Sequence, residues 1–242
     1  MINKERPFFT VAIPTWEING LGVQYLQDSF NILAQQTFTD FEVIISDHSL
    51  NEDIKHVCDL WTEAMALLDI KYFKNDRGRG KIAPNLNNAL LRSSGLFIKV
   101  LFQDDFLYDE NSLEHIYNAI EKNQDANWIL NGSVHTDEEG IVMYDKMIPK
   151  YHDRIYLGNN TISCPTVLTI RNENPLFFDE SLNWLVDVDY YKKLYDKFGE
   201  PLIVEEVCAV NRNSKVRTTN ILTEDEKVKE YFKMMDRYEG IK

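Results

Sequence analysis

Two adjacent carboxylates, Asp104 and Asp105, interrupt an otherwise apolar stretch of the chain. They follow residues 100–102, whose composition is typical of a buried strand. Neighbouring carboxylates repel each other, so a cation or a ligand hydroxyl has to balance a buried pair. In open α/β sheets, ligands bind at the carboxyl ends of the strands. The pair is therefore a candidate ligand site; its alternative role is to begin a loop and cap the helix expected after Glu110.

Single polar side chains stand just beyond two earlier apolar runs. Thr15 and Glu17 follow the run at residues 8–13, and Asp47 follows the run at residues 41–46. We expect Thr15 and Glu17 to line a ligand pocket and Asp47 to accept hydrogen bonds from the ligand. An Asp in such a place can equally satisfy the backbone of its own turn, and Glu17 can equally be a solvated loop acid.

A basic, glycine-containing loop provides a third feature with chemical potential. Arg77, Arg79 and Lys81 alternate with glycines in an otherwise acidic chain. Such a loop can neutralise a diphosphate, or it can be an ordinary solvated surface loop. Asn85 and Asn88 follow near the start of the next predicted helix, where asparagine also caps well.

These residues need a scaffold, and the pattern of apolar residues predicts one. Apolar runs predict strands at 8–13, 41–46, 70–73, 96–102, 166–170 and 202–210. Apolar residues at helical spacing predict helices at 21–36, 52–68, 84–92, 112–121, 189–198 and 224–238. The alternation of strand and helix favours an α/β fold with a largely parallel sheet. After residues 128–130 this alternation stops, and 131–160 is expected to form hairpins and loops.

Composition limits the classes of function. The 242-residue chain has a formal net charge of −13, which argues against a nucleic-acid surface. Its three cysteines are scattered without a CxxC pair, as expected for free thiols in a reducing compartment. The chain begins without a leader-like apolar segment, and no apolar run is long enough to cross a bilayer. We therefore expect a soluble, cytoplasmic protein.

Five short motifs, taken in order, carry a resemblance to a known family. They are VAIPTWE at 11–17, FEVIISDHSLNED at 41–53, KNDRGRGKIAPNLNNAL at 74–90, FQDD at 102–105 and FFDESLNWLVDVDYYKKL at 177–194. Together they resemble the family 2 glycosyltransferases, which have the GT-A fold. A late segment, VNRNSKVRTT at 210–219, is similar to the family's Tyr-Arg-x-His loop. Three positions depart from the family pattern: Phe102 replaces an acid of the DxD motif, Val186 replaces a Glu, and Ser214 stands at the His.

The resemblance implies a single GT-A-like domain over residues 1–242. Residues 1–130 would bind the nucleotide-sugar through a Rossmann-like, mostly parallel sheet, 131–220 would form a mixed acceptor and catalytic half, and 221–242 a C-terminal helix. Asp105 would hold Mn²⁺ or Mg²⁺. Asp104 would bind a ribose hydroxyl or support the metal ligands without contacting the metal. The other donor-binding residues would be Thr15, Glu17, Asp47, Arg79, Lys81 and Asn85.

The resemblance also implies an inverting reaction, in which Asp187 is the general base that takes a proton from the acceptor hydroxyl. Asp189 could substitute for it, and both could instead be helix-start acids that suit the helix dipole. Trp184 could stack on a sugar face or belong to the core. Asn213 or Ser214 could offer another metal oxygen in place of the missing His.

The expected partners are a nucleotide-sugar, most simply a UDP-sugar, and a glycan or other hydroxyl acceptor recognised by residues 131–160. Any contact with a membrane is expected through the acceptor alone, and the oligomeric state is left open. Two other readings remain. The three departures favour a catalytically degenerate sugar- or nucleotide-binding module. A nucleotidyltransferase is disfavoured because residues 14–22 contain no basic side chain.

Overall fold

The computed structural model describes residues 6–64, 68–213 and 222–240. Its first half alternates strands with helices, as the apolar pattern predicts. The strands are β1 (Phe9–Thr15), β2 (Phe41–Asp47), β3 (Ile70–Lys74) and β4 (Phe97–Val100). The helices are α1 (Gly22–Leu33), α2 (Asp53–Ala64) and α3 (Ile82–Arg92), and a short 3₁₀ turn, η1 (Ile18–Gly20), precedes α1.

The second half contains more strands of mixed direction. Its strands are β5 (Phe106–Leu107), β6 (Trp128–Thr136), β7 (Met143–Met147), β8 (Leu168–Arg171) and β9 (Leu202–Arg212). Its helices are α4 (Ser112–Glu121), α5 (Val186–Phe198) and α7 (Glu224–Glu239). Two 3₁₀ turns, η2 (Ile155–Leu157) and η3 (Pro165–Val167), lie between β7 and β8.

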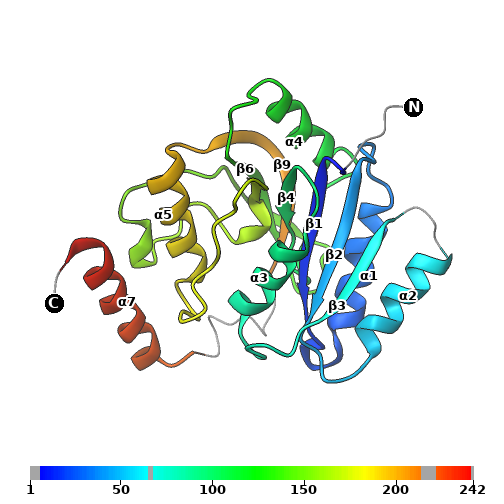
Figure 1. The fold of residues 1–242 in the computed structure, drawn as a ribbon, viewed down its shortest axis with the longest axis horizontal. Helices are drawn as coiled ribbons and strands as arrows, with labels where there is room; N and C mark the ends of the chain where they lie inside the picture. The colour runs from blue at the N-terminus through cyan, green and yellow to red at the C-terminus, as the bar shows by residue number, and fades with distance from the viewer. Residues whose placement is uncertain (1–5, 65–67, 214–221, 241–242) are drawn as a thin grey trace.

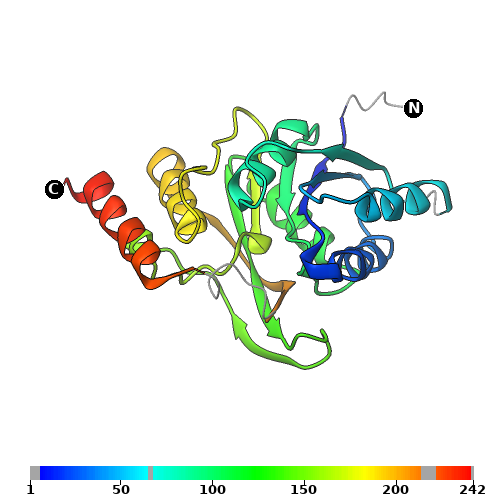
Figure 2. The same ribbon diagram turned by 90° about the horizontal axis from the view of Figure 1, so that it is seen from below.

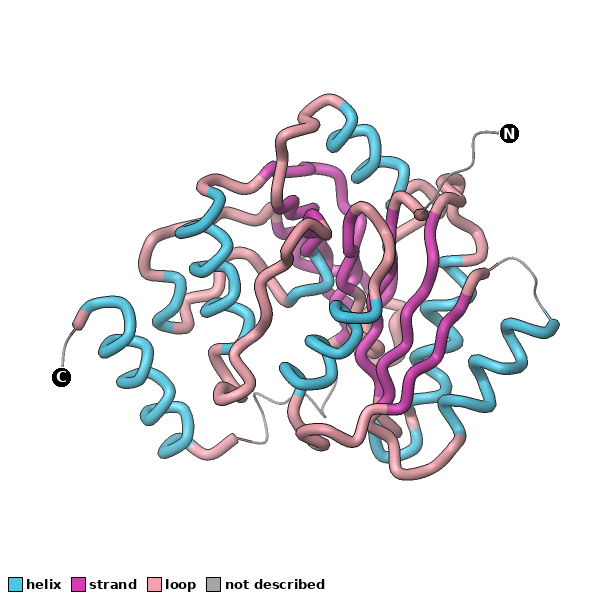
Figure 3. Tube along the Cα trace, viewed as in Figure 1, coloured by secondary structure: helices cyan, strands magenta, loops and turns pink. Residues whose placement is uncertain are grey.

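One sheet runs through both halves of the described chain. Its order is β3-β2-β1-β4-β8-β6-β9-β5, and β7 pairs with β6 outside this path. Strands β1 to β4 are parallel to one another where they pair, whereas β8, β5 and β7 pair antiparallel to their neighbours. Helices flank the sheet on both faces (Figures 1 and 3). The predicted α/β class, with a parallel first half and a mixed second half, is confirmed.

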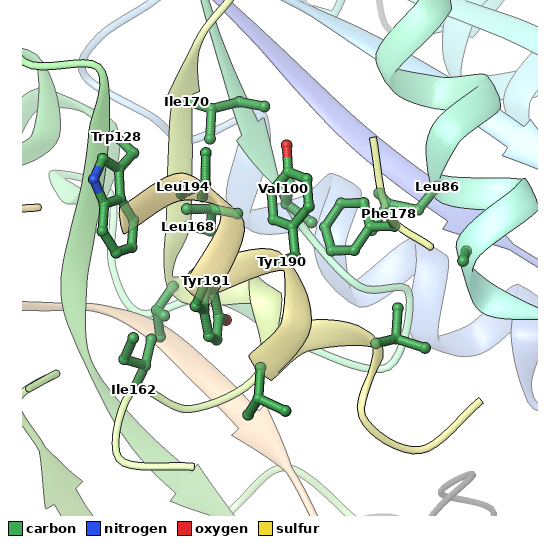
Figure 4. Packing of buried hydrophobic residues seen from close by; sticks show 14 of the residues in the cluster. Leu86, Val100, Trp128, Ile162, Leu168, Ile170, Phe178, Tyr190, Tyr191 and Leu194 are labelled. Carbon is green, nitrogen blue, oxygen red and sulfur yellow. The ribbon is translucent and has the colours of Figure 1, made fainter. Parts of the chain in front are cut away.

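The two faces of the sheet bury separate hydrophobic clusters because successive strand residues point in opposite directions. On β1, Val11 and Ile13 join the cluster under α1, α2 and α4, and Ala12 joins the cluster under α3 and α5. Figure 4 shows the latter cluster, in which Phe178 stacks on Tyr190 with ring centroids 3.8 Å apart. This packing fixes α5 against the sheet and so fixes the acidic first turn of that helix.

Strand β6 confirms the hairpin expected within 131–160, because it pairs antiparallel with β7, and it runs past residues 128–130, where the predicted alternation stops, as far as Thr136. Apart from Val134, residues 131–136 are polar or glycine, so their apolar pattern is weak. They form a strand because they pair in parallel with β9 over its whole length. Gly132 allows this approach, since a Cβ there would lie 2.8 Å from the carbonyl oxygen of Glu206. The β6–β7 hairpin then projects from the body of the molecule (Figure 2).

The C-terminal helix α7 is attached through polar contacts with the start of α5. Glu230 accepts hydrogen bonds from the backbone nitrogens of Asn183, Trp184 and Leu185 at 2.6, 2.9 and 2.9 Å. Helix α7 lies outside α5 at one end of the molecule (Figures 1 and 2). In the part of the chain that the structure describes, no helix combines the length and the apolar character needed to cross a membrane.

Candidate functional site

The carboxyl ends of β1 and β2 meet at one edge of the sheet, where Thr15 and Asp47 are directly paired. The Asp47 carboxylate is fully buried. Its Oδ1 accepts hydrogen bonds from Ser49 Oγ at 2.6 Å, from Ser49 N at 2.9 Å and from Thr15 Oγ1 at 3.2 Å. Its Oδ2 accepts from Tyr72 OH at 2.8 Å and lies 3.4 Å from Lys74 Nζ. These contacts support the turn-forming role of Asp47; its contact with a ligand stays a prediction.

Two further candidates, Glu17 and Arg79, hold the loop that follows β2. Glu17 Oε2 lies 3.3 Å from the backbone nitrogen of Leu50, and its side chain is partly exposed. The Arg79 guanidinium donates to the carbonyl oxygens of His48 and Ser49 at 2.8 Å each, and it is one-third exposed. Both side chains therefore stand at the edge of the β2 loop, where they can contact a ligand while they brace the backbone.

Asn85 and Lys81 come from the start of α3 and behave differently. The buried Asn85 amide donates to the carbonyl oxygen of Thr15 at 2.9 Å and accepts from Ser46 Oγ at 2.7 Å, so it ties α3 to both strand ends. Lys81 is exposed, and its Nζ lies 3.4 Å from the Glu180 carbonyl oxygen. Next to it, a cavity of about 300 Å³ lies beside the direct contact between Asn87 of α3 and Phe178. Its lining residues are Asn75, Arg77, Pro84, Asn87, Asn88, Leu91, Phe177, Phe178 and Glu180.

The two acids after β4 differ in their surroundings. Asp105 is buried, and both of its carboxylate oxygens accept from the protein. Its Oδ1 accepts from the backbone nitrogen of Arg212 at 2.9 Å, and its Oδ2 accepts from Thr166 Oγ1 at 2.5 Å. Asp104 is partly exposed at the same strand end. The sequence could not tell which acid points inward. These contacts support a loop-fixing role for Asp105, and its binding of a metal stays a prediction.

Arg212, at the end of β9, holds the backbone of Asp104 through a hydrogen bond. Its Nε donates to the carbonyl oxygen of Asp104 at 2.9 Å, and its guanidinium bonds Asp28 of α1 at 2.8 Å. The buried guanidinium lies over the rings of Tyr25 and Phe106, 4.4 and 5.4 Å from their centroids. Such a charge-assisted, cation–π setting fixes the side chain firmly. In the sequence, Arg212 is marked only by its place in the segment at 210–219 that is similar to the Tyr-Arg-x-His loop.

Lys99 in β4 lies behind the acidic loop, and the sequence did not single it out. It is fully buried, donates to Asn131 Oδ1 at 2.8 Å and hydrogen-bonds the carbonyl oxygen of Thr166. Burial lowers the pKa of this lysine to about 8. Because Thr166 in turn bonds Asp105, Lys99 joins the sheet interior to the acidic loop. In the sequence it is a single cation inside an apolar strand, and this unusual position is the feature that could have indicated its buried contacts.

Asp187 and Asp189, on the first turn of α5, have separate partners. Asp187 Oδ2 accepts from the Asn160 amide at 2.8 Å, and burial raises the pKa of Asp187 to about 6. Asp189 is fully buried and binds Arg237 at 2.6 Å and Tyr238 OH at 2.7 Å, both on α7. Its contacts favour a structural role over that of a substitute base. Asp187 as the base stays a prediction.

Residues 160–164 connect the Asp187 region with the strand-end acids. The Cys164 Sγ lies 3.1 Å from Asp105 Oδ2 and 3.1 Å from Asn211 Oδ1. The Asn211 amide donates to Ser163 Oγ at 2.6 Å, and the Ser163 carbonyl oxygen accepts from Asn160 at 2.9 Å. The path of contacts from one acid to the other is Asp105, Cys164, Asn211, Ser163, Asn160 and Asp187. These contacts link the two predicted centres, although the single proton of the Cys164 thiol can be donated to only one of its two neighbouring oxygens at a time.

The metal expectation can be compared with these donors. Within the described ranges, no group of three or more His, Cys, Asp and Glu side chains is arranged to hold a metal ion. Mg²⁺-type sites commonly use one or two carboxylates, with phosphate oxygens and water completing the shell. The partly exposed Asp104 fits such a sparse site, whereas both oxygens of Asp105 already accept from the protein. Of the other candidate ligands, Asn213 is exposed and Ser214 lies outside the described residues.

Trp184, the candidate sugar-stacking ring, is partly buried and packs against the cluster under α3 and α5. Its ring also closes over Gly158, where a Cβ would lie 3.3 Å from it. These contacts support the core reading of Trp184.

Comparisons with known proteins agree with this architecture. Residues 10–194 match the family model described as "Glycosyl transferase family 2". An uncharacterized glycosyltransferase of Rickettsia bellii is 29% identical over 142 residues, which are 57% of this chain and 19% of that protein. The GalNAc(5)-diNAcBac-PP-undecaprenol beta-1,3-glucosyltransferase of Campylobacter jejuni is 32% identical over 103 residues, 42% of this chain and 31% of that protein. The chain thus matches between a fifth and a third of the length of these relatives.

Solved structures of the same fold include S. aureus TarS 1–349 in complex with UDP-GlcNAc. It has a TM-score of 0.71 at 19% identity, covering 95% of this chain and 65% of that one. The mannosyltransferase PcManGT from Pyrobaculum calidifontis, in complex with GDP-Man and Mn²⁺, has a TM-score of 0.67 at 13% identity, covering 98% and 65%. These likenesses establish the predicted GT-A fold. With the family model matching residues 10–194 as well, the chain belongs to glycosyl transferase family 2, a family of glycosyltransferases.

Proposed function

We propose that this protein transfers a sugar, with inversion, from a nucleotide-sugar to a hydroxyl of a glycan or other acceptor. The observation that carries the proposal is the framework of residues 160–164, which joins the acids after β4 to Asp187. Through this framework Asp105, which holds the loop that carries Asp104, is connected to Asp187. A UDP-sugar is the simplest donor, since TarS is described in complex with UDP-GlcNAc and with UDP.

On the donor side, we assign the role facing the diphosphate to Asp104 rather than Asp105. Asp105 has Thr166 and the Arg212 backbone on its two oxygens, so its work is to hold the loop in place. Asp104 is partly exposed, and Arg212 fixes its backbone. Mn²⁺ or Mg²⁺ bound at Asp104 would neutralise the charge that develops on the leaving diphosphate.

On the acceptor side, Asp187 takes the proton of the attacking hydroxyl. The acceptor oxygen bonds to the anomeric carbon as the bond from that carbon to the diphosphate oxygen breaks, and the electron pair leaves with the nucleoside diphosphate. A pKa of about 6 leaves Asp187 ionised at neutral pH yet makes it more basic than an ordinary aspartate. Activity should therefore fall as the pH drops below about 6.

The acceptor itself should be recognised by residues 131–160, which include the projecting β6–β7 hairpin (Figure 2). Arg212 joins this hairpin to the donor side, because its guanidinium donates to the carbonyl oxygen of Glu138 at 2.9 Å. A cytoplasmic location and contact with a membrane through the acceptor alone stay predictions, as does the assignment of residues 1–242 to a single domain.

The test measures the release of nucleoside diphosphate from a donor by the purified protein in the presence of Mn²⁺. The donor probes are UDP-GlcNAc, UDP-glucose and GDP-mannose, and water is the default acceptor. Asp187→Asn should lower turnover by about 10²–10⁴-fold, because a general base acts in the transition state, and should barely change nucleotide affinity. Asp196→Asn, on the exposed side of the same helix, is the matched control. Nucleotide binding without turnover in the parent protein would instead favour the degenerate binding module.

A further inference from the structure

We propose that Asn160 is a positioning residue for Asp187: its side-chain amide fixes the Oδ2 atom of the Asp187 carboxylate and stabilises the ionised form that accepts a proton. This inference rests on the proposed function only in giving Asp187 the role of base. The contact itself is a 2.8 Å hydrogen bond from Asn160 Nδ2. The other carboxylate oxygen, Oδ1, accepts from the backbone nitrogen of Val188 at 2.8 Å.

Asn160 is itself held at both ends of its amide. Its Oδ1 accepts from the backbone nitrogens of Ile162 and Ser163 at 2.9 and 3.1 Å, which closes a tight turn over residues 160–163. Its Nδ2 also donates to the carbonyl oxygen of Ser163 at 2.9 Å. With these bonds made, the amide has a fixed orientation, and its remaining N–H is directed at Asp187. A side chain ordered in this way places the carboxylate without further loss of entropy in the reaction.

The turn is in turn anchored to the donor side. Ser163 has a φ of 99°, a conformation that non-glycine residues rarely adopt. It is held there from two directions: Asn211 of β9 donates to its Oγ at 2.6 Å, and Tyr191 of α5 donates to its carbonyl oxygen at 3.1 Å. Strained residues of this kind persist where their surroundings determine them, and they are common at functional sites. Through Asn160 and Ser163, the position of Asp187 is therefore linked to Asn211 at the end of β9.

The ionisable groups on the elements next to Asp187 are neutral or have other partners, and they do not replace the Asn160 contact. Tyr191 on α5 and Cys164 in the 160–164 segment are buried, and burial raises the pKa of each well above its ordinary value, so both are neutral near pH 6. On α7, Glu230 binds the backbone that precedes α5, and Arg237 binds Asp179 and Asp189. Because Asn160→Asp keeps the oxygen that closes the turn, a change in the pKa of Asp187 in that variant can be assigned to the replaced amide donor.

The decisive variant is Asn160→Asp, because it keeps the oxygen that closes the turn while it replaces the amide donor with a carboxylate. The control is Asn159→Asp, which makes the same change one residue earlier on an exposed side chain. The titration of Asp187 is followed by NMR of ¹³C-labelled aspartate, with the signal assigned by its loss in Asp187→Asn. We expect the apparent pKa of Asp187 to rise by about one unit or more in Asn160→Asp and to stay at the parent value in Asn159→Asp.

Asn160→Ala, which removes the donor and adds no charge, gives a second measurement if the first variant fails to fold, and its expected shift is also upward. The acidic limb of the pH dependence of nucleotide-sugar hydrolysis should move with the NMR value. An unmoved or lowered pKa of Asp187 in a folded Asn160 variant would overturn the inference. If Asp187→Asn itself leaves hydrolysis unchanged, the proposed function fails separately, since the NMR titration reports on Asn160 whether or not Asp187 is catalytic.

Discussion

Replacing Asp187 with Asn should make the protein more stable while it removes activity. Burial raises the pKa of Asp187 from an ordinary value of 3.8 to about 6 in the folded protein. At pH 8 the carboxylate is ionised in both states, and the shift corresponds to a cost of about 3 kcal/mol to the folded state. The cost appears as the pH rises from about 4 to about 6, because only the unfolded chain loses its proton over that range.

The amide removes this cost but loses one contact. Asn at 187 can still accept from the Val188 backbone through its oxygen, but its NH₂ then faces the NH₂ of Asn160. A lost hydrogen bond of this kind costs about 1 kcal/mol. The net expectation at pH 8 is therefore a gain of about 2 kcal/mol in the free energy of unfolding, and the gain should shrink as the pH falls below 6.

Urea unfolding at pH 8 and pH 5.5, followed by circular dichroism, measures this effect, and nucleotide release under the same conditions measures activity. Asp196→Asn serves as the control, because it removes only an exposed pair with Lys192 and should change stability by less than about 0.5 kcal/mol. It would refute this reasoning if Asp187→Asn lowered the free energy of unfolding at pH 8, or raised it no more than Asp196→Asn does. Burial would then not destabilise the ionised form of Asp187.

Four other substitutions test ligand contact and structural support. Asp104→Asn should weaken UDP affinity in Mn²⁺ by about tenfold or more and leave thermal stability nearly unchanged. Asp105→Asn should instead lower the free energy of unfolding by about 1–3 kcal/mol, because it disturbs buried hydrogen bonds. Calorimetric titration and urea unfolding of both variants would reveal a reversed assignment. Asp47→Ala should likewise cost about 1–3 kcal/mol of stability through the donors it leaves unpaired, and reduced UDP affinity at unchanged stability would return Asp47 to the nucleotide pocket. Glu230→Gln should weaken the attachment of α7 to α5 and expose the C-terminal helix to limited proteolysis; an unchanged cleavage pattern would contradict the anchoring role of this carboxylate.

The sequence predicted the first half of the fold well, because its strands are apolar runs and its helices carry apolar residues at regular spacing. It underestimated β6, whose second half, residues 131–136, is polar or glycine apart from Val134 and becomes a strand only through pairing with β9. It began α5 at Asp189, three residues late, since the start of that helix at Val186 is fixed by Glu230 from α7. Contacts between distant parts of the chain decided both differences.

The candidate site shows the same limit. The sequence drew attention to Asp104 and Asp105 together, but adjacency cannot say which of two acids points inward. That choice is made by Thr166 and Arg212, which lie 61 and 107 residues further along the chain. Asn160 carries no signal of its own in the sequence, because its contact with Asp187 spans 27 residues of the chain.

The most direct test of the account is a crystal structure of the Asp187→Asn protein soaked with UDP-GlcNAc and Mn²⁺, since that variant should bind the donor without consuming it. We expect the nucleotide at the carboxyl ends of β1, β2 and β4, the cation at Asp104, and the anomeric carbon open to attack from the side of residue 187. A nucleotide bound elsewhere, such as the cavity between α3 and residues 177–180, or a sugar whose leaving diphosphate faces residue 187, would contradict it.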